Sequence, residues 1–200
     1  TVSVDTDNGT FDLLYKIVGE GTKQLADRKI GDVLSVIGPI GNGFELTDRK
    51  IPLLIGGGVG MPPMIAIAQK IKDNAHYNPY VILGSEVPFP FEASQSSLSG
   101  FNSSKFHTMP LLEEWRVPCG LASLQDYEGV YKGYVTDLAR EYLDSLSSSD
   151  LKEVEVFTCG PNPMLEAVSK PVSYTHLRAH ETLMNLVCRL LLEKRGVSLF

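Results

Sequence analysis

The sequence predicts a chain of two parts: the end of an antiparallel β-barrel, followed by a doubly wound α/β domain with a parallel sheet. Short strand-like runs separated by Gly and Pro turns occupy residues 1–46, which is typical of a small antiparallel barrel. Over residues 50–170, short apolar runs alternate with stretches at helical spacing, and this indicates parallel strands covered by helices. We therefore place the link between the two domains near residues 46–50.

The expected elements of the first part are short. Residues 10–18 alternate and are rich in Phe, Leu, Tyr, Ile and Val, so they predict a strand after an Asn8-Gly9 turn. A short helical stretch is expected near residues 23–26. Residues 32–37 are expected to form a further strand of the barrel.

The second part contains three continuous apolar runs, as buried parallel strands do, and three stretches with helical periodicity. The expected strands are residues 51–55, 80–83 and 154–157, and the expected helices are residues 64–71, 136–146 and 164–169. Thr136 is the expected N-cap of its helix, because its hydroxyl oxygen can accept a hydrogen bond from the first turn. Residues 147–149 are expected to form a polar loop.

Composition and charge argue against several classes of protein. The formal net charge is −6 and no basic patch occurs, so nucleic acid is not an expected partner. No apolar run approaches the roughly 20 residues of a membrane helix, and the first residues do not resemble an export signal. Cys119, Cys159 and Cys188 are far apart and form no C-x2-C pair, which argues against a zinc site or a disulfide framework. A reducing, cytoplasmic setting is expected. The strand-like start without Met indicates a fragment.

The strongest motif is a glycine loop between the first buried strand and the following helix. Glycine lets the backbone approach a pyrophosphate closely, and a helix N-terminus offers free N–H groups and the positive end of its dipole. A proline stands near where the ordinary G-x-G-x-x-G fingerprint has its third glycine, which argues against that fingerprint. The alternative is a glycine turn that binds no ligand. The expected binding residues of this loop are Gly56, Gly57, Gly58, Gly60, Met61 and Pro62.

A second loop, Cys159-Gly160-Pro161-Asn162-Pro163-Met164, joins the third buried strand to a helix. It lies at the carboxyl end of its strand, which is the edge where open α/β sheets bind ligands. Cys159, Gly160 and Pro161 are therefore candidate binding residues. The alternative for Cys159 is a small buried apolar residue.

These two loops, about a hundred residues apart, resemble the ferredoxin–NAD(P) reductase family. Residues 19–22 resemble its FAD-phosphate loop, and residues 38–44 resemble the segment that closes its FAD domain. Residues 132–138 are similar to a stretch typical of electron-transfer subunits of dihydroorotate dehydrogenase. The resemblance covers about residues 1–170.

The resemblance implies FAD and NAD as cofactors, with the first loop on the NAD pyrophosphate and the second facing the nicotinamide. It further implies flavin contacts at Leu14, Tyr15 and Lys16, and flavin-phosphate contacts at Gly21 and Thr22. The alternative for these five residues is an amphipathic barrel strand that ends in a turn. No catalytic acid or base is assigned, because hydride transfer between nicotinamide and flavin requires stacking geometry rather than a protein proton donor.

Cofactor choice depends on the stretch after the second buried strand. Glu86 there is expected to accept hydrogen bonds from ribose hydroxyls. No Lys or Arg occurs between Lys72 and Lys105, so a 2′-phosphate would lack a local cation. The sequence therefore favours NADH over NADPH. The alternative for Glu86 is a solvated loop carboxylate.

The sequence departs from the family at both ends. The family's Arg-x-x-Ser/Thr motif is absent, and residues 171–200 are interpreted as a foreign tail that replaces the cysteine region ligating a 2Fe–2S centre. His176 and His180 stand four residues apart, but they lack further ligands, so no metal site is assigned.

The resemblance implies an electron-transfer flavoprotein of pyrimidine biosynthesis. Its partner would be the FMN-containing catalytic subunit of dihydroorotate dehydrogenase, in a heterotetramer, with neither nucleic acid nor a membrane as a partner. Two alternatives stay open: a reductase of the same family that serves a hydrogenase, sulfide dehydrogenase or oxygenase, and a truncated nucleotide-binding fragment without activity.

Overall fold

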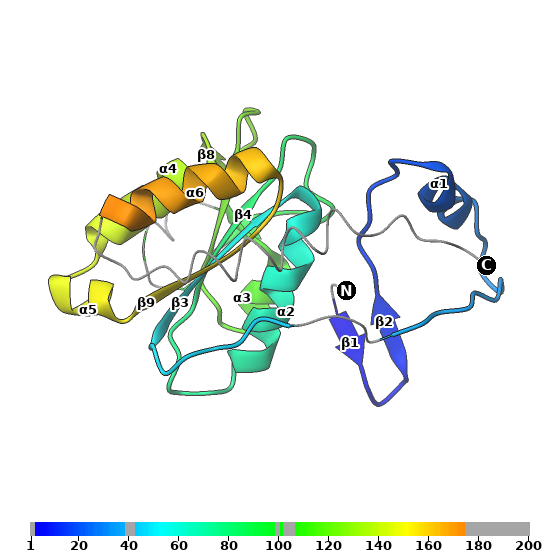
Figure 1. Ribbon diagram of the computed structural model, residues 1–200, viewed down its shortest axis with the longest axis horizontal. Helices are drawn as coiled ribbons and strands as arrows, with labels where there is room; N and C mark the ends of the chain where they lie inside the picture. Colours follow the sequence, from blue (N-terminus) through cyan, green and yellow to red (C-terminus); the bar gives the residue numbers. More distant parts are fainter. Residues whose placement is uncertain (1–2, 39–42, 99–100, 102–106, 175–200) are drawn as a thin grey trace.

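A computed structural model describes residues 3–38, 43–98, 101 and 107–174 of the 200-residue chain. Its larger part is a five-stranded parallel sheet with helices on both faces, and the N-terminal residues lie to one side of it (Figure 1). The predicted doubly wound α/β domain is therefore confirmed.

The sheet has the strand order β8-β7-β4-β3-β9. From β3 the chain steps outward through β4, β7 and β8, and it then crosses back to place β9 on the other side of β3. The order thus reverses between β3 and β9, which makes this pair the topological switch point of the sheet. The strands are β3 Ile51–Gly57, β4 Tyr80–Gly84, β7 Cys119–Ser123, β8 Tyr131–Lys132 and β9 Val154–Cys159.

The three predicted strands correspond to β3, β4 and β9, whose residues are almost entirely buried. Their neighbours β7 and β8 were missed. The first of these is interrupted by Gly120, and the second is only two residues long, so neither gives a continuous apolar run.

Helices cover both faces of the sheet. On one face lie α2 (Met61–Ile71) and α3 (Pro110–Glu114), and on the other lie α4 (Val135–Ser145) and α6 (Asn162–Tyr174) (Figure 1). Successive strand residues point to opposite faces, so Leu54 packs on the α2 side while Leu53 and Ile55 pack on the α4 side. This two-sided burial explains the continuous apolar runs in the sequence.

Two details of the predicted helices are wrong. The N-cap of α4 is Tyr134 rather than Thr136, which lies in the first turn with its side chain buried against the sheet. The Asp137 carboxylate instead accepts a hydrogen bond from the Tyr134 N–H at 3.3 Å. The predicted polar loop at 147–149 begins a short helix, α5 (Ser148–Lys152), because the Ser147 hydroxyl accepts from the Asp150 N–H at 3.1 Å.

The N-terminal part shows an antiparallel hairpin and a short helix in its described residues, where the sequence predicts the end of a barrel. Among the described residues it contains the antiparallel pair β1 (Ser3–Asp5) and β2 (Thr10–Asp12), followed by α1 (Glu20–Ala26), which contains the helical stretch predicted near 23–26. The strand predicted over 10–18 ends at Asp12. The strand predicted over 32–37 is wrong: these residues are irregular and exposed.

The predicted strands are shortened or absent here because a strand needs a neighbouring strand for its backbone hydrogen bonds. It also needs a packed layer that buries its apolar side chains. Alternate residues after the hairpin turn keep the pattern of a half-buried strand but remain exposed. These are Phe11 (49%), Leu13 (53%), Tyr15 (39%) and Ile17 (57%). A second hairpin, β5 (Ser94–Gln95) with β6 (His107–Thr108), lies outside the main sheet.

The link between the two parts is fastened to the amino end of the sheet. The Thr47 hydroxyl donates to the Glu155 carboxylate at 2.8 Å, and the Arg49 guanidinium donates to the Val154 carbonyl at 2.6 Å. The Tyr77 hydroxyl donates to the Thr47 carbonyl at 3.1 Å. The link is thus part of the α/β domain rather than a free tether.

Candidate functional site

Two glycine-containing loops meet at the carboxyl ends of β3 and β9. Gly57 ends β3, a 3-10 turn covers Gly58–Gly60, and α2 follows at once. On the other side of the switch point, β9 ends at Cys159, and α6 begins two residues after Gly160. The topology therefore brings together the two motifs that the sequence places about a hundred residues apart.

The loops touch through their backbones at Gly60. A Cβ atom at this position would overlap the Cys159 carbonyl group and lie 2.7 Å from the Gly160 nitrogen. Only a residue without a side chain allows this approach. Gly60 therefore serves loop–loop packing. Gly56 is similar, because a Cβ there would lie 2.8 Å from the Cα of Met61.

Gly58 differs from its neighbours because it faces open space. It has φ +55°, it is exposed, and a Cβ built on it meets no atom within 4 Å. A backbone N–H group near such a position can reach an anion without obstruction. A ligand could therefore approach the loop from the side of Gly58.

The start of α2 supplies fewer free N–H groups than the sequence argument assumed. Pro62 and Pro63 have no N–H, and the Met61 N–H donates to the Gly58 carbonyl. The positive end of the helix dipole remains, and Gly60 as N-cap has no side chain to compete with a ligand. An anion here would rely on this dipole and on N–H groups of the turn at 58–60.

Cys159 lies in the core instead of on the crevice surface. Its residue is only 6% exposed, and it belongs to the apolar cluster on the α2 face. Pro161 is exposed, and its carbonyl accepts from the N–H groups of Met164 at 2.9 Å and Leu165 at 3.1 Å. The exposed surface of this loop is thus formed by Pro161 and the residues that follow it.

Exposed apolar side chains gather at this same edge of the sheet. Among the described residues from 50 onward, the large apolar side chains that remain exposed follow β3, β4, β7 and β8 in turn. They are Val59 (40%), Val87 (65%), Leu124 (49%) and Tyr134 (61%). An apolar edge bordered by polar groups is typical of a surface that binds a ligand or another protein.

Glu86 also lies at this edge, just beyond β4, and it is exposed. The loop around it is anchored to β7: the buried Ser123 hydroxyl donates to the Ser85 carbonyl at 2.7 Å and accepts from the Gln125 N–H at 3.1 Å. Sequence reasoning missed Ser123, because nothing in its neighbourhood marks it as a bridge between two strands.

A cation that the sequence argument did not consider stands at the far end of this edge. Lys132 in β8 forms an ion pair with Asp126 at 3.3 Å, and both side chains are mostly exposed. An exposed pair of this kind contributes at most about 1 kcal/mol, so Lys132 could exchange Asp126 for another anion at little cost. The pairing itself depends on tertiary structure, and the sequence gives no signal for it.

The expected flavin residues fall in two places. Leu14 packs against the apolar cluster of the α2 face, while Tyr15 is 39% exposed and Lys16 is exposed. Gly21 and Thr22 lie in the first turn of α1 instead of in a loop. The Thr22 hydroxyl oxygen accepts from the N–H groups of Val18 at 3.0 Å and Gly19 at 3.2 Å.

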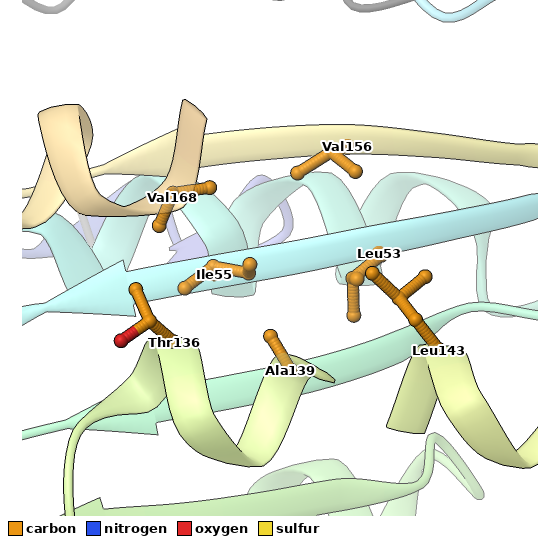
Figure 2. A pocket seen from close by; sticks show the side chains of 7 residues that line it. All are labelled: Leu53, Ile55, Thr136, Ala139, Leu143, Val156 and Val168. Carbon is orange, nitrogen blue, oxygen red and sulfur yellow. The ribbon is translucent and has the colours of Figure 1, made fainter. Parts of the chain in front are cut away.

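A small hollow lies behind the switch point, between β3, β9, α4 and α6 (Figure 2). Its walls are apolar apart from one hydroxyl, and they include Ile55, Thr136, Ala139 and Val168. It lies between sheet and helices in the core. It is therefore a packing gap of the α4 face and not part of the candidate site.

Across the described ranges, no group of three or more His, Cys, Asp or Glu side chains could hold a metal ion. Every helix in those ranges falls short of the length and apolar character that crossing a membrane requires. The His176 and His180 pair and Cys188 lie outside the described residues.

Residues 54–170 match the family described as oxidoreductase NAD-binding domain. The chain is 32% identical to the electron transfer subunit of dihydroorotate dehydrogenase B (NAD(+)) from Listeria innocua, over 90% of this chain and 63% of that protein. It is 30% identical to the subunit of the same name from Caldanaerobacter subterraneus, over 96% of this chain and 62% of that protein. The chain thus spans less than two thirds of these relatives.

Two solved structures share the fold. An NADH-dependent reduced ferredoxin-NADP oxidoreductase matches with a TM-score of 0.58 and 25% identity, over 80% of this chain and 50% of that chain. A flavohemoglobin from Malassezia yamatoensis with bound FAD and heme matches with a TM-score of 0.58 and 16% identity, over 84% of this chain and 40% of that chain.

Proposed function

The chain belongs to the oxidoreductase NAD-binding domain family, and from this premise we propose that it binds NADH at the β3/β9 switch point and delivers hydride to FAD. The observation that carries the proposal is the meeting of two glycine loops, backbone against backbone, under an apolar edge of the sheet. In an open α/β sheet this is the position where a dinucleotide binds.

The strand order suggests how the nucleotide lies. The pyrophosphate would sit at the turn Gly58–Gly60, where the dipole of α2 and an unobstructed glycine face it. The adenosine half would extend over β4, where the exposed Glu86 carboxylate can accept from ribose hydroxyls. The nicotinamide half would then lie over β9, beside Gly160 and Pro161. Gly56, Gly57, Met61, Pro62 and Cys159 would support the loops from below.

We propose NADH as the preferred nucleotide. Glu86 would repel a 2′-phosphate at the end of β4, and no cation lies beside it in the sequence between Lys72 and Lys105. Lys132 lies farther along the edge, beyond β7, and is paired with Asp126. Its partner would have to be displaced before it could hold the extra phosphate of NADPH.

The N-terminal part fits a flavin through its apolar side and its backbone. Leu14, Tyr15 and Lys16 would line the isoalloxazine ring, since Tyr15 is accessible and Leu14 holds this segment against the α/β domain. Gly21 and Thr22 would bind phosphate through their N–H groups, because the first turn of a helix leaves these groups without intrahelical partners. Bound FAD would supply hydride acceptance and one-electron release. The residues of the chain would only bind and orient it, and we assign none as a proton donor.

The names of the relatives support a place in pyrimidine biosynthesis. We propose that the intact protein is the electron-transfer subunit of a dihydroorotate dehydrogenase and works with the FMN-containing catalytic subunit, as a heterotetramer in the cytoplasm. A 2Fe–2S centre would need four cysteine ligands. Cys119 and Cys159 do not fit that role, because both thiols lie in the core of the α/β domain. This part of the chain would therefore perform only the NADH–FAD half of the reaction.

A second candidate is a reductase of the same fold that serves another redox partner, such as a hydrogenase, sulfide dehydrogenase or oxygenase. The match to an NADH-dependent reduced ferredoxin-NADP oxidoreductase favours it, since the name of that protein gives a different redox partner. The domain boundaries that we propose are residues 1–46 for the partial FAD domain and 50–170 for the NAD domain. Residues 171–200 would be a foreign tail, although α6 continues to Tyr174.

The test is to express the full chain, add FAD, remove unbound flavin, and record the visible spectrum before and after anaerobic NADH. Flavin bands that bleach with NADH, and more slowly with NADPH, would support the proposal. A folded chain that binds NADH but retains no flavin would reduce the proposal to its nucleotide half. A folded chain that binds neither would contradict it.

A further inference from the structure

The segment of residues 10–18 presents a free strand edge at the surface. Its first three residues form β2, which pairs only with β1 among the described strands. The strand β1 contacts α2, and Figure 1 shows β2 on the side of the hairpin that faces away from the α/β domain. A sheet of two strands is marginally stable by itself in water, and a free edge is a template for one more strand.

The rest of this segment can extend the edge. Residues 13–18 continue β2 without a strand partner in the described part of the chain. None of them has a positive φ, so an extended backbone is available to all of them without strain. Strand pairing along the whole segment therefore requires no residue to leave an ordinary conformation.

One face of the segment is apolar and uncovered. Side chains of an extended strand alternate between two faces, so Phe11, Leu13, Tyr15 and Ile17 share one face. All four are exposed. Leu14 belongs to the opposite face and packs against the apolar cluster of the α2 face. The segment is thus held to its own domain by one face, while the other face remains open to solvent.

Charge favours one register for pairing with a second copy of the chain. In an antiparallel pair with its two-fold axis at Leu14, Asp12 of each copy stands opposite Lys16 of the other. The symmetry makes both oppositely charged pairs at once. A shift of the register by two residues would place each charge opposite a Leu, Val or Thr. A shift by one residue would mix the two faces of the strands.

We propose that residues 10–18 form an interface between two copies of this chain, as an antiparallel strand pair centred on Leu14. The register sets Phe11 opposite Ile17 and Leu13 opposite Tyr15, and an aromatic side chain beside an aliphatic one is a favourable cross-strand pair. The two hairpins thereby join into one sheet with a continuous apolar face. The interface does not include the switch point of β3 and β9, so the inference is independent of the proposed NADH site.

The test measures the mass of the full chain by sedimentation over a range of protein concentrations. FAD is left out, because the proposed flavin residues belong to the same segment. The mass should rise toward twice the chain mass of 21.9 kDa. Asp12→Lys and Lys16→Glu each place like charges opposite one another at two positions of the dimer. Each variant should raise the dissociation constant about tenfold, which corresponds to about 1.4 kcal/mol.

The double variant Asp12→Lys/Lys16→Glu is the decisive one. It restores opposite charges in the same register, so its dissociation constant should return close to that of the unaltered chain. Lys23→Glu is the matched control, because Lys23 is an exposed cation of α1 outside the segment. It should leave the dissociation constant unchanged. Trp115 fluorescence verifies that each variant is folded.

A second comparison keeps the proposal testable if Asp12→Lys does not fold. Lys16→Glu is then compared with Lys16→Arg, which preserves the positive charge and should preserve the dimer.

Each result decides for or against the interface. Dimers that the single variants weaken and the double variant restores support it. A chain that stays monomeric at every concentration would overturn it, and so would a double variant as weak as the single ones. Growth beyond the dimer would contradict it as well, because a two-fold contact closes on itself. NADH binding by the unaltered chain tests the nucleotide site separately, so the two proposals can fail independently.

Discussion

Replacing Gly60 by alanine should destabilise the α/β domain more than the same replacement at Gly58, two residues earlier. The added methyl group at Gly60 would overlap the Cys159 carbonyl. No side-chain rotation can relieve this overlap, because the atoms in conflict are backbone atoms at the end of β9. The two loops must separate, and overpacking of this kind costs about 1–3 kcal/mol. We expect a value near the upper limit, since β3 and β9, which pair along six residues, both end at this contact.

Gly58→Ala provides the matched control. Its methyl group would point into open space, so the variant bears only the cost of a left-handed backbone conformation at φ +55°, about 1 kcal/mol. The two substitutions add the same methyl group to the same turn. They differ in what that group meets and in the backbone conformation, since Gly60 has φ −84°.

The assay is urea unfolding followed by the fluorescence of Trp115, the only tryptophan of the chain, which packs against the cluster of the α2 face. With a slope of about 2 kcal/mol per molar urea, a loss of about 3 kcal/mol lowers the midpoint by about 1.5 M, against about 0.5 M for Gly58→Ala. Equal midpoints for the two variants would refute the packing of the two loops against one another.

Three further predictions concern features away from the loops. Glu155→Ala removes the carboxylate that holds Thr47 and should cost about 1 kcal/mol and speed proteolysis of the link near residue 47; Glu155→Gln, which keeps an acceptor oxygen, should do so less. Burial raises the pKa of Glu113, but hydrogen bonds from Ser97 outweigh this and the pKa is lowered overall. That stabilisation is present above the ordinary value of 4.5 and is lost as the pH falls through the lowered pKa, so amide exchange near Ser97 should quicken only in acid. Burial raises the pKa of the Cys119 thiol to about 12, so iodoacetamide at pH 8 should not alkylate this cysteine until urea unfolds the chain. Rapid alkylation of Cys119 in the folded protein, located by mass spectrometry, would contradict this.

The sequence was a good guide wherever local pattern and burial agree. The runs at 51–55, 80–83 and 154–157 are buried on both faces, and a strand in that position has to be apolar at every residue. The glycine loops could be found because close backbone contact excludes every side chain, as at Gly60. In both cases the environment of a residue, either burial or close backbone contact, restricts the type of that same residue.

The predictions are wrong where the structure of a segment depends on the elements that pack against it. Residues 32–37 have the composition of a strand, yet no described strand or layer covers them, so their apolar side chains stay exposed. Thr136 has a capping side chain, but the sheet beneath α4 buries it and the helix begins one residue earlier. The Ser123 hydroxyl links β7 to the residue after β4, but the residues around Ser123 in the sequence contain no motif that predicts this contact.

The prolines after the glycine loop show how local sequence and function can separate. Taken alone, Pro62 and Pro63 appear to be a defect in an anion-binding helix, because they remove two N–H groups from its first turn. In the structure the Met61 N–H is also used, by the Gly58 carbonyl, so the first turn of α2 is closed to a ligand. At the proposed NADH site, anion binding would then depend on the preceding turn, which contacts Cys159 at the end of β9. A pyrophosphate bound there would lie between the two loops instead of on one helix, while glycine at residue 60 is required by the packing of the loops themselves.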